Sequence, residues 1–558
     1  MYRTLFLAIL LISLIITENR IQPANSEITL DSSTGANMSL APLLDNLGTH
    51  HHPISTESKL AQRYFDQGLI LTYGFNHGEA ARSFREAARL DPDCAMCYWG
   101  IALVLGPNIN AMMEPEAVPE AYSALQKAKE LAVNGSEREQ AYIQALSKRY
   151  RAYSVNNRDS LDRAYAEAMG EVAKKYPEDL DAATLYAEAL MDTTPWDYWV
   201  EGEPKPETKE ILTTLESVLA KNPNHPGANH LYIHAVESSP HPEQGEAAAD
   251  RLRNLVPGAG HLVHMPGHIY INIGRYNDTS VVNQEAIAAD QAYISQCHAQ
   301  GLYPLAYIPH NQHFLWASAT MEGRSELAIQ AARDVAASVD TEIMAKPGYG
   351  MLQHFYAMPL YALTKFERWE EIIEEPEPQL PYLQGVWHFA RGMAYVGQGD
   401  LSQGEQELAI LKEIAVDNAL KEVNINFNSA VDLIRMATDF LEAKLASQKG
   451  DYDIVIADLK EALVIEDQLH YDEPTPWYSP VRQFLGTVLL KANFPAEAEK
   501  FYSQDLDKNP ENGWSLKGLA QSLYAQGKSQ AAEKMQERFE RAWKYADAKL
   551  KNFDSLTF

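Results

Sequence analysis

The sequence predicts an all-α solenoid built from antiparallel helix pairs. From Ser58 onward the chain is rich in Ala, Leu, Glu, Lys and Gln, and its apolar residues recur at the spacing of amphipathic helices. Gly or Pro interrupts this pattern roughly every 12 to 17 residues, which is typical of short turns between helices. Stacked pairs bury one continuous core, so a length of 558 residues does not by itself predict several separate domains.

The composition indicates which kinds of molecule the protein is expected to bind. The chain carries 76 acidic and 47 basic residues, which gives a formal net charge of −29. Nucleic-acid backbones are bound by clustered Lys and Arg, so no nucleic-acid partner is expected. Three cysteines are too few for a scaffold held together by disulfides. Cys94 and Cys97 stand three residues apart at a predicted helix entry, where they could form a disulfide, hold a metal, act as a redox pair or remain inert thiols.

The N-terminus has the pattern of a cleavable secretory signal. Arg3 precedes an apolar run of 12 residues, Leu5 to Ile16, which is too short to span a bilayer. Small residues near Ser26 complete the pattern and predict a signal peptide over residues 1–26 of an exported protein, either periplasmic or secreted. The later sequence contains no apolar run long enough for a transmembrane segment. Residues 27–57 are rich in small polar residues and predict a flexible leader.

The helical region carries a repeated pattern of small and aromatic residues. A 34-residue unit starting at Ala61 places the following residues at unit positions 4, 8, 20, 24, 27 and 32: Tyr64, Gly68, Ala80, Phe84, Ala87 and Pro92. Matching offsets recur near the other end of the chain, at Gly486, Ala498, Tyr502 and Pro510. This pattern resembles the tetratricopeptide repeat (TPR) family across most of residues 58–545. The resemblance implies a right-handed superhelix in which the first helix of each pair faces a concave groove.

The histidine content divides the repeats into three regions. N-terminal TPR-like repeats are expected over residues 58–222, central His-rich repeats over 223–395 and C-terminal repeats over 396–545, followed by a tail at 546–558. The central region is the candidate site because its histidines are in phase with the repeat.

The phase is visible in two pairs of histidines. His230 and His264 are 34 residues apart, and so are His234 and His268. A repeat frame set by the prolines of the preceding turns assigns the first pair to unit position 5 and the second pair to position 9. By the resemblance, these positions face the concave groove. Pro266 lies between His264 and His268 and predicts a kink or break in their helix.

We therefore predict a histidine-lined groove that binds a transition metal. The candidate ligands are His230, His234, His261, His264, His268, His310, His313 and His354. Copper or zinc suits an all-imidazole site, and iron suits a site that includes a carboxylate such as Glu237. Glu237 could also be a hydrogen-bond acceptor for a ligand or a general base. The alternatives are core histidines with satisfied hydrogen bonds and histidines that recognise an anionic or peptide ligand.

The sequence leaves the activity open. A metal with a free coordination position would make the protein a metalloenzyme acting on a peptide or small molecule, but no catalytic motif decides this. The alternative is a non-catalytic TPR scaffold that binds a peptide or protein partner in the same groove.

Overall fold

The computed structural model describes residues 39–297 and 303–547, and these residues are almost entirely helical. The prediction of an all-α, TPR-like helical fold is confirmed. Within the described ranges the strands form two short antiparallel ribbons, β1 (Trp199–Val200) with β2 (Glu203–Pro204) and β3 (Asn424–Ile425) with β4 (Asn428–Ser429). None of the helices in these ranges combines the length and apolar character needed to cross a membrane. The predicted signal peptide, residues 1–26, lies outside the described residues.

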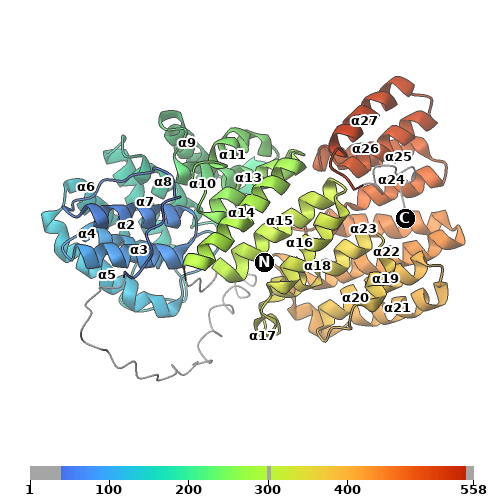
Figure 1. The fold of residues 1–558 in the computed structure, drawn as a ribbon, viewed down its shortest axis with the longest axis horizontal. Helices are drawn as coiled ribbons and strands as arrows, with labels where there is room; N and C mark the ends of the chain where they lie inside the picture. The colour runs from blue at the N-terminus through green and yellow to red at the C-terminus, as the bar shows by residue number, and fades with distance from the viewer. Residues whose placement is uncertain (1–38, 298–302, 548–558) are drawn as a thin grey trace. The chain divides into compact units, whose positions relative to one another are not determined.

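The chain folds into two compact units. Unit 1 comprises residues 1–269 and 285–304, and unit 2 comprises residues 270–284 and 305–558. The helices of unit 1 are α2 (Lys59–Tyr73), α3 (His77–Leu90), α4 (Ala95–Val104), η1 (Pro115–Ala117), α5 (Val118–Leu131), η2 (Ala132–Asn134), α6 (Glu137–Leu146), α7 (Asp159–Lys175), α8 (Leu180–Met191), α9 (Pro206–Lys221), α10 (Pro226–Val236), η3 (Pro242–Gly245), α11 (Glu246–Leu252) and α12 (Gly260–His264) (Figure 1).

Three elements pass from one unit to the other, namely α13 (Pro266–Asn272), α14 (Tyr276–Gln296) and η4 (Tyr303–Tyr307). The helices of unit 2 are α15 (Ile308–Met321), α16 (Ser325–Ala337), α17 (Thr341–Met344), α18 (Gly350–Lys365), α19 (Trp369–Glu374), α20 (Pro381–Gly397), α21 (Leu401–Ile414), η5 (Asn418–Glu422), α22 (Ala430–Lys449), α23 (Tyr452–Glu466), α24 (Val481–Lys491), α25 (Pro495–Lys508), α26 (Gly513–Ala525) and α27 (Ser529–Ala542).

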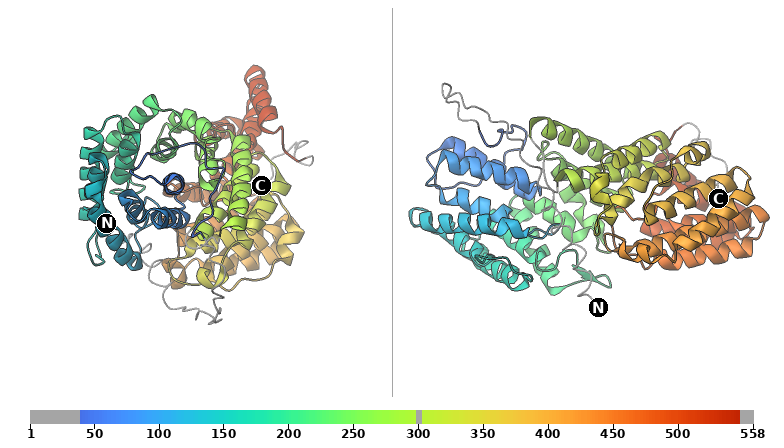
Figure 2. Two further views of the ribbon diagram at one scale, coloured as in Figure 1. Left: turned by 60° about the vertical axis from the view of Figure 1, so that its left-hand side comes forward. Right: turned by 90° about the horizontal axis from the view of Figure 1, so that it is seen from below.

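Within each unit, consecutive helices pack as neighbours. In unit 1, α2 packs on α3 and α4 on α5, and in unit 2, α20 packs on α21 and α22 on α23 (Figure 2). The repeat positions explain how the helices approach so closely. A Cβ atom at Gly68 of α2 would lie 2.7 Å from the ring of Phe84 of α3, and one at Gly486 of α24 would lie 2.6 Å from the ring of Tyr502 of α25. An aromatic ring on one helix therefore fills the space that glycine leaves on the other.

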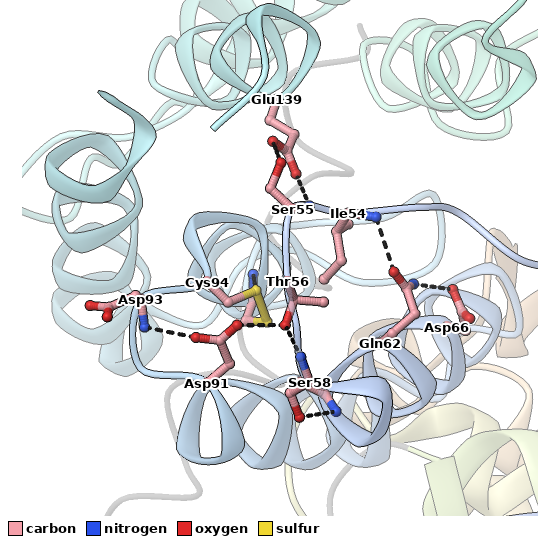
Figure 3. Close-up of a disulfide and its surroundings, with 12 residues drawn as sticks. Ile54, Ser55, Thr56, Ser58, Gln62, Asp66, Asp91, Asp93, Cys94 and Glu139 are labelled. Atoms are coloured by element: carbon pink, nitrogen blue, oxygen red, sulfur yellow. Dashed lines mark hydrogen bonds between the residues drawn. A yellow bond between two sulfur atoms is a disulfide. The ribbon is translucent and has the colours of Figure 1, made fainter. Parts of the chain in front are cut away.

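The described part of the leader, residues 39–57, corrects the expectation of a flexible segment. This segment runs among the helices of unit 1 and is held by hydrogen bonds to several of them (Figure 3). The Ile54 N–H donates to Gln62 on α2, and both the N–H and the hydroxyl of Ser55 donate to Glu139 on α6. The hydroxyl of Thr56 donates to Asp91, which follows α3. Composition alone could not show this, because Asp91 and Glu139 lie 35 and 84 residues away from their partners along the sequence.

The same region holds the two neighbouring cysteines. Cys94 and Cys97 form a disulfide at the start of α4, where the Sγ atom of Cys94 also accepts a hydrogen bond from the Cys97 N–H. Both cysteines are buried. The disulfide therefore lies in the core beneath the leader.

The close approach of α2 and α3 gives a test of the packing. We expect Gly68→Ala to lower the free energy of unfolding by about 1–3 kcal/mol, because its methyl group overlaps the Phe84 ring. The matched control is Gly74→Ala, whose Cβ would lie 3.5 Å from its nearest neighbours, an ordinary contact. Urea unfolding followed by circular dichroism measures both, and equal stability of the two variants would contradict this account of the crossing.

Candidate functional site

Helix α10 supplies the first two histidines of the candidate site. Pro226 occupies its first turn, where a missing N–H costs nothing, and the side chain of His225 caps it by accepting the Ala228 N–H. His230 and His234 are four residues apart and so lie on one face of the helix. Glu237 follows immediately after the helix and continues that face.

The other histidines come from a broken helix. His261 and His264 lie on α12, which ends at His264, and α13 begins at Pro266 and carries His268. The break is at the predicted position, because proline removes a helical hydrogen bond and crowds the preceding turn. The main chain therefore changes course between His264 and His268.

These side chains form what we call the imidazole cluster, defined as His230, His234, His261, His264 and His268. Each ring lies near at least two others, with centroid separations between 4.6 Å (His264 and His268) and 6.2 Å (His234 and His261). All five residues are buried, with 0–2% of their surface exposed. The cluster therefore lies in the interior of unit 1.

Hydrogen bonds at Nδ1 orient three of the five rings. The Nδ1–H of His230 donates to the main-chain oxygen of Tyr73 at 2.6 Å. The Nδ1–H of His234 donates to Oε1 of Glu237 at 2.6 Å, and the Nδ1–H of His268 donates to Oε2 of the same carboxylate. Because a neutral imidazole carries one proton, the Nε2 atom of each of these rings carries a lone pair.

The Nε2 atoms point toward one another. Nε2 of His230 lies 3.1 Å from Nε2 of His261, and Nε2 of His264 lies 2.7 Å from Nε2 of His268. His230, His234 and His261 each offer a nitrogen, and these three atoms lie within 4.8 Å of one another. A proton can occupy the space between two such nitrogens, and a metal ion that accepts both lone pairs can replace it.

Burial keeps the cluster neutral. It lowers the pKa of His230 well below the ordinary value, and the nearby His234 lowers it further despite the opposing hydrogen bond to Tyr73. Burial likewise lowers the pKa of His261, reinforced first by His230 and then by the other histidines. Neutral rings are the form that binds metal, so a bound ion would only have to displace the proton that two facing Nε2 atoms share.

Two aromatic residues cover the cluster, which corrects the prediction of an open, histidine-lined groove. The Phe75 ring centroid lies 4.6 Å from that of His230, and the Trp196 centroid lies 5.3 Å from that of His234. Both aromatic residues have positive φ angles, 54° and 60°, a conformation that costs a non-glycine residue about 1–3 kcal/mol. The turn after α2 and the loop after α8 thus fold over the face predicted to be open.

The three remaining predicted ligands lie in unit 2. His310 on α15 is partly exposed, and its ring packs against Phe314. His313 and His354 are buried with ring centroids 5.8 Å apart, and Nδ1 of His354 lies 2.8 Å from the Tyr382 hydroxyl. Burial lowers the pKa of His313 and brings the pKa of His354 to about 3. Of the eight predicted histidines, five thus belong to unit 1 and three to unit 2.

A second buried group, which was not predicted from the sequence, is centred on Asp181 of α8. Its carboxylate accepts hydrogen bonds from four side chains, those of His50, His52, Tyr73 and His225. Burial raises the pKa of Asp181, but the charge of His50 and these hydrogen bonds outweigh burial and lower it well below the ordinary value.

Within this second group, His225 is not oriented as a metal ligand. Nδ1 of His225 accepts the Ala228 N–H, so its Nε2 carries the proton and donates to Asp181. A ring nitrogen that donates a proton has no lone pair for a metal. The Asp181 group instead anchors the leader to α2, α8 and α10.

The chain was compared with known proteins by sequence and by structure. No protein-family model matches the chain, and no curated protein matches it significantly. Among solved structures, the human IFIT1 dimer with m7Gppp-AAAA is 12% identical and covers 88% of this chain and 91% of its own, with a TM-score of 0.30. The APC/C hetero-tetramer Cut9-Hcn1 is 13% identical, with coverages of 84% and 78% and a TM-score of 0.31. The P58(IPK) TPR domain is 12% identical, with coverages of 84% and 99% and a TM-score of 0.22.

With identities of 12–13% and TM-scores of 0.22–0.31, these likenesses are remote. The packed helix pairs and the glycine-aromatic crossings at Gly68 and Gly486 are features of the chain itself. The chain is therefore an all-helical protein with TPR-like helix crossings.

Proposed function

We propose that the imidazole cluster binds a transition-metal ion, with His230, His234 and His261 as ligands. The observation that carries this proposal is the set of Nδ1 hydrogen bonds. Two of the three ligands have their Nδ1 proton committed to an oxygen, so their Nε2 lone pairs are available to a metal. Metal-binding histidines typically donate their other ring N–H to an oxygen in this way, which fixes the orientation of the ring.

The spacing of the nitrogens supports the proposal. Metal-to-nitrogen bonds of about 2.0–2.1 Å at tetrahedral angles place two ligand nitrogens about 3.3–3.4 Å apart. Nε2 of His230 and Nε2 of His261 are 3.1 Å apart, so a metal requires an outward shift of only a few tenths of an ångström. For this pair a small side-chain rotation is sufficient.

The donor set favours copper or zinc. Both carboxylate oxygens of Glu237 accept hydrogen bonds from imidazoles, which makes Glu237 a residue that orients ligands. The candidate ligands are therefore all imidazoles, a set that suits copper and zinc better than an iron site containing a carboxylate. If a coordination position stays open, the metal can activate water or a small substrate.

The TPR-like fold also supports a different function. Helical-repeat proteins commonly use a concave surface to bind a protein or peptide. The five histidines of unit 1 would not form that surface, because they are buried. A scaffold function would leave the imidazole cluster as a structural core without metal, and the metal content of the protein separates the two proposals.

We further propose that the protein is exported, as its N-terminal sequence indicates. The Cys94–Cys97 disulfide supports export because such bonds persist mainly in oxidising compartments. The mature protein from its native cells is expected to begin after Ser26. N-terminal sequencing tests this, and a chain that retains Met1 would contradict export through a cleaved signal.

The metal proposal is tested on the full mature chain, purified without a histidine tag, stripped with a chelator and dialysed against copper or zinc. Elemental analysis is expected to find at least one tightly bound ion per chain, and less than about 0.2 per chain would overturn the proposal. His261→Ala is expected to abolish stoichiometric binding. His241→Ala is the matched control, since His241 is exposed and pairs with exposed Glu243, and it should bind metal as the wild type does.

Glu237 provides a separate test of how the ligands are held. In Glu237→Gln, the amide oxygen can accept from one imidazole, but the amide N–H₂ faces the Nδ1–H of the other. That ring must move its proton to Nε2, so metal affinity should fall about 10–100-fold. Glu243→Gln, which alters the exposed pair with His241, is the control. Calorimetric titration measures the affinities, and equal values for both variants would show that Glu237 does not orient the ligands.

A further inference from the structure

We infer that Lys365 is a covalent attachment site for a small aldehyde, which forms a Schiff base with the lysine amine inside a cavity of unit 2. All residues that line this cavity belong to unit 2, so the inference does not depend on the imidazole cluster. It adds a nucleophile and a class of ligand that metal binding does not imply.

The cavity lies at the C-terminal end of α18. Lys365 ends that helix and lines the cavity together with residues of α24 and α26, among them Gln483, Phe484 and Trp514. The cavity has about 30 Å³ of space for the centre of a water molecule, and about 10–15 Å³ is enough to hold one water. It therefore suits a ligand of about two or three non-hydrogen atoms.

The amine of Lys365 lies beside the aromatic walls of this cavity. Its Nζ atom is 4.1 Å from the ring centroid of Trp514 and 5.5 Å from that of Phe484. Nζ also donates a hydrogen bond to Oγ of Ser479 at 2.6 Å. Because this bond uses an N–H, the lone pair of a neutral amine stays available to an electrophile in the cavity.

Burial brings the amine into its nucleophilic form. Lys365 is buried, and burial lowers its pKa to about 7, although the charges of Asp505 and Glu367 act in the opposite direction. A large fraction of the amine is therefore neutral near pH 7. Lysines that lose their charge through burial are the ones that form Schiff bases with carbonyl compounds.

Gln483 supplies an acceptor that has no other use in the fold. Its side chain is buried and lines the cavity, and among the described residues none donates a hydrogen bond to its Oε1 atom. Buried acceptors normally have a donor. The hydroxyl group that forms when an amine adds to an aldehyde is such a donor.

The reaction is a condensation in which nothing is oxidised or reduced. Nζ of Lys365 attacks the carbonyl carbon, one amine hydrogen moves to the carbonyl oxygen, and a C–N bond and a hydroxyl group result. The hydroxyl then leaves as water with the second amine hydrogen, and a C=N bond replaces the C–N bond. Protonation of this imine gives it a positive charge.

The charges around Lys365 favour this product over an anionic one. The faces of the Trp514 and Phe484 rings attract a cation, and Asp505 and Glu367 both raise the pKa of Lys365. Carbon dioxide, another small electrophile, would convert the amine into a carbamate anion, which the same groups repel. The ligand class is therefore an aldehyde of one or two carbons.

The experiment treats the full mature chain near neutral pH with acetaldehyde and sodium cyanoborohydride, which reduces the imine to a stable ethyl-lysine. Peptide mass spectrometry measures the initial rate at each lysine. We expect Lys365 to be labelled at least tenfold faster than Lys449, which is exposed and paired with Glu405. Equal or slower labelling of Lys365 would overturn the inference.

Lys444 is the matched control for the role of the cavity. It is also buried, with a pKa lowered by burial to about 8, but it does not line the cavity. Lys365 should be labelled faster than Lys444 as well. Equal rates would show that the cavity does not direct the reaction, and the assignment of the site would then be wrong.

Two further arms test the size of the cavity and its dependence on the fold. Benzaldehyde, which is too large for the cavity, should label Lys449 but not Lys365, and rapid labelling of Lys365 by benzaldehyde would contradict the small site. In guanidinium chloride the cavity is lost, so Lys365 and Lys449 should react at equal rates. A preference for Lys365 that persists in the unfolded chain would also overturn the inference. All rates are read from one wild-type chain, so no variant has to fold.

Discussion

The interior of unit 1 depends on which hydrogen-bond partner each imidazole finds for its Nδ1 atom. A buried ring must stay neutral, so it has one N–H donor and one lone pair, and each requires a partner. The oxygens of Tyr73 and Glu237 take the Nδ1 protons of His230, His234 and His268, which turns lone pairs toward the centre of the cluster. At His225, by contrast, Nδ1 accepts a hydrogen bond from the Ala228 N–H, so the ring proton is on Nε2 and is donated to Asp181. Similar residues thus form a candidate metal site in one place and a structural anchor in the other.

Tyr73 joins these two groups. Its main-chain oxygen accepts from His230, and its hydroxyl donates to Asp181 at 2.6 Å. His50 and His52 of the leader donate to the same carboxylate, so the leader helps to fix the end of α2 that orients a candidate ligand. Burial lowers the pKa of His50, but the charge and hydrogen bond of Asp181 outweigh burial and raise it. The contribution of His50 to stability is thus complete below its unfolded pKa of about 6.5 and is lost as the pH rises through the folded value.

Periodicity predicted those features that depend on local spacing. The all-α fold, the small-aromatic crossings at Gly68 and Phe84, and the break at Pro266 all follow from residues near one another in sequence or at the repeat distance. The burial of the histidines does not follow, because Tyr73, which contacts His230, is 157 residues away from it. The covering role of Trp196 was equally invisible, since no pattern marks which loop folds over which repeat. The repeat frame assigned the histidines to equivalent positions on neighbouring helices. It could not show which residues from other parts of the chain pack against them.

Burial also changes the electrostatics that a metal must satisfy. In an open groove water would screen the charge of the ion, whereas in a dry interior any net charge is costly. Neutral imidazoles supply no charge, and the Glu237 carboxylate supplies one negative charge beside the cluster. A monovalent ion would be balanced by that carboxylate, whereas a divalent ion would leave one positive charge for another ligand to offset. A divalent ion bound at His230, His234 and His261 would therefore favour a small anion as a further ligand.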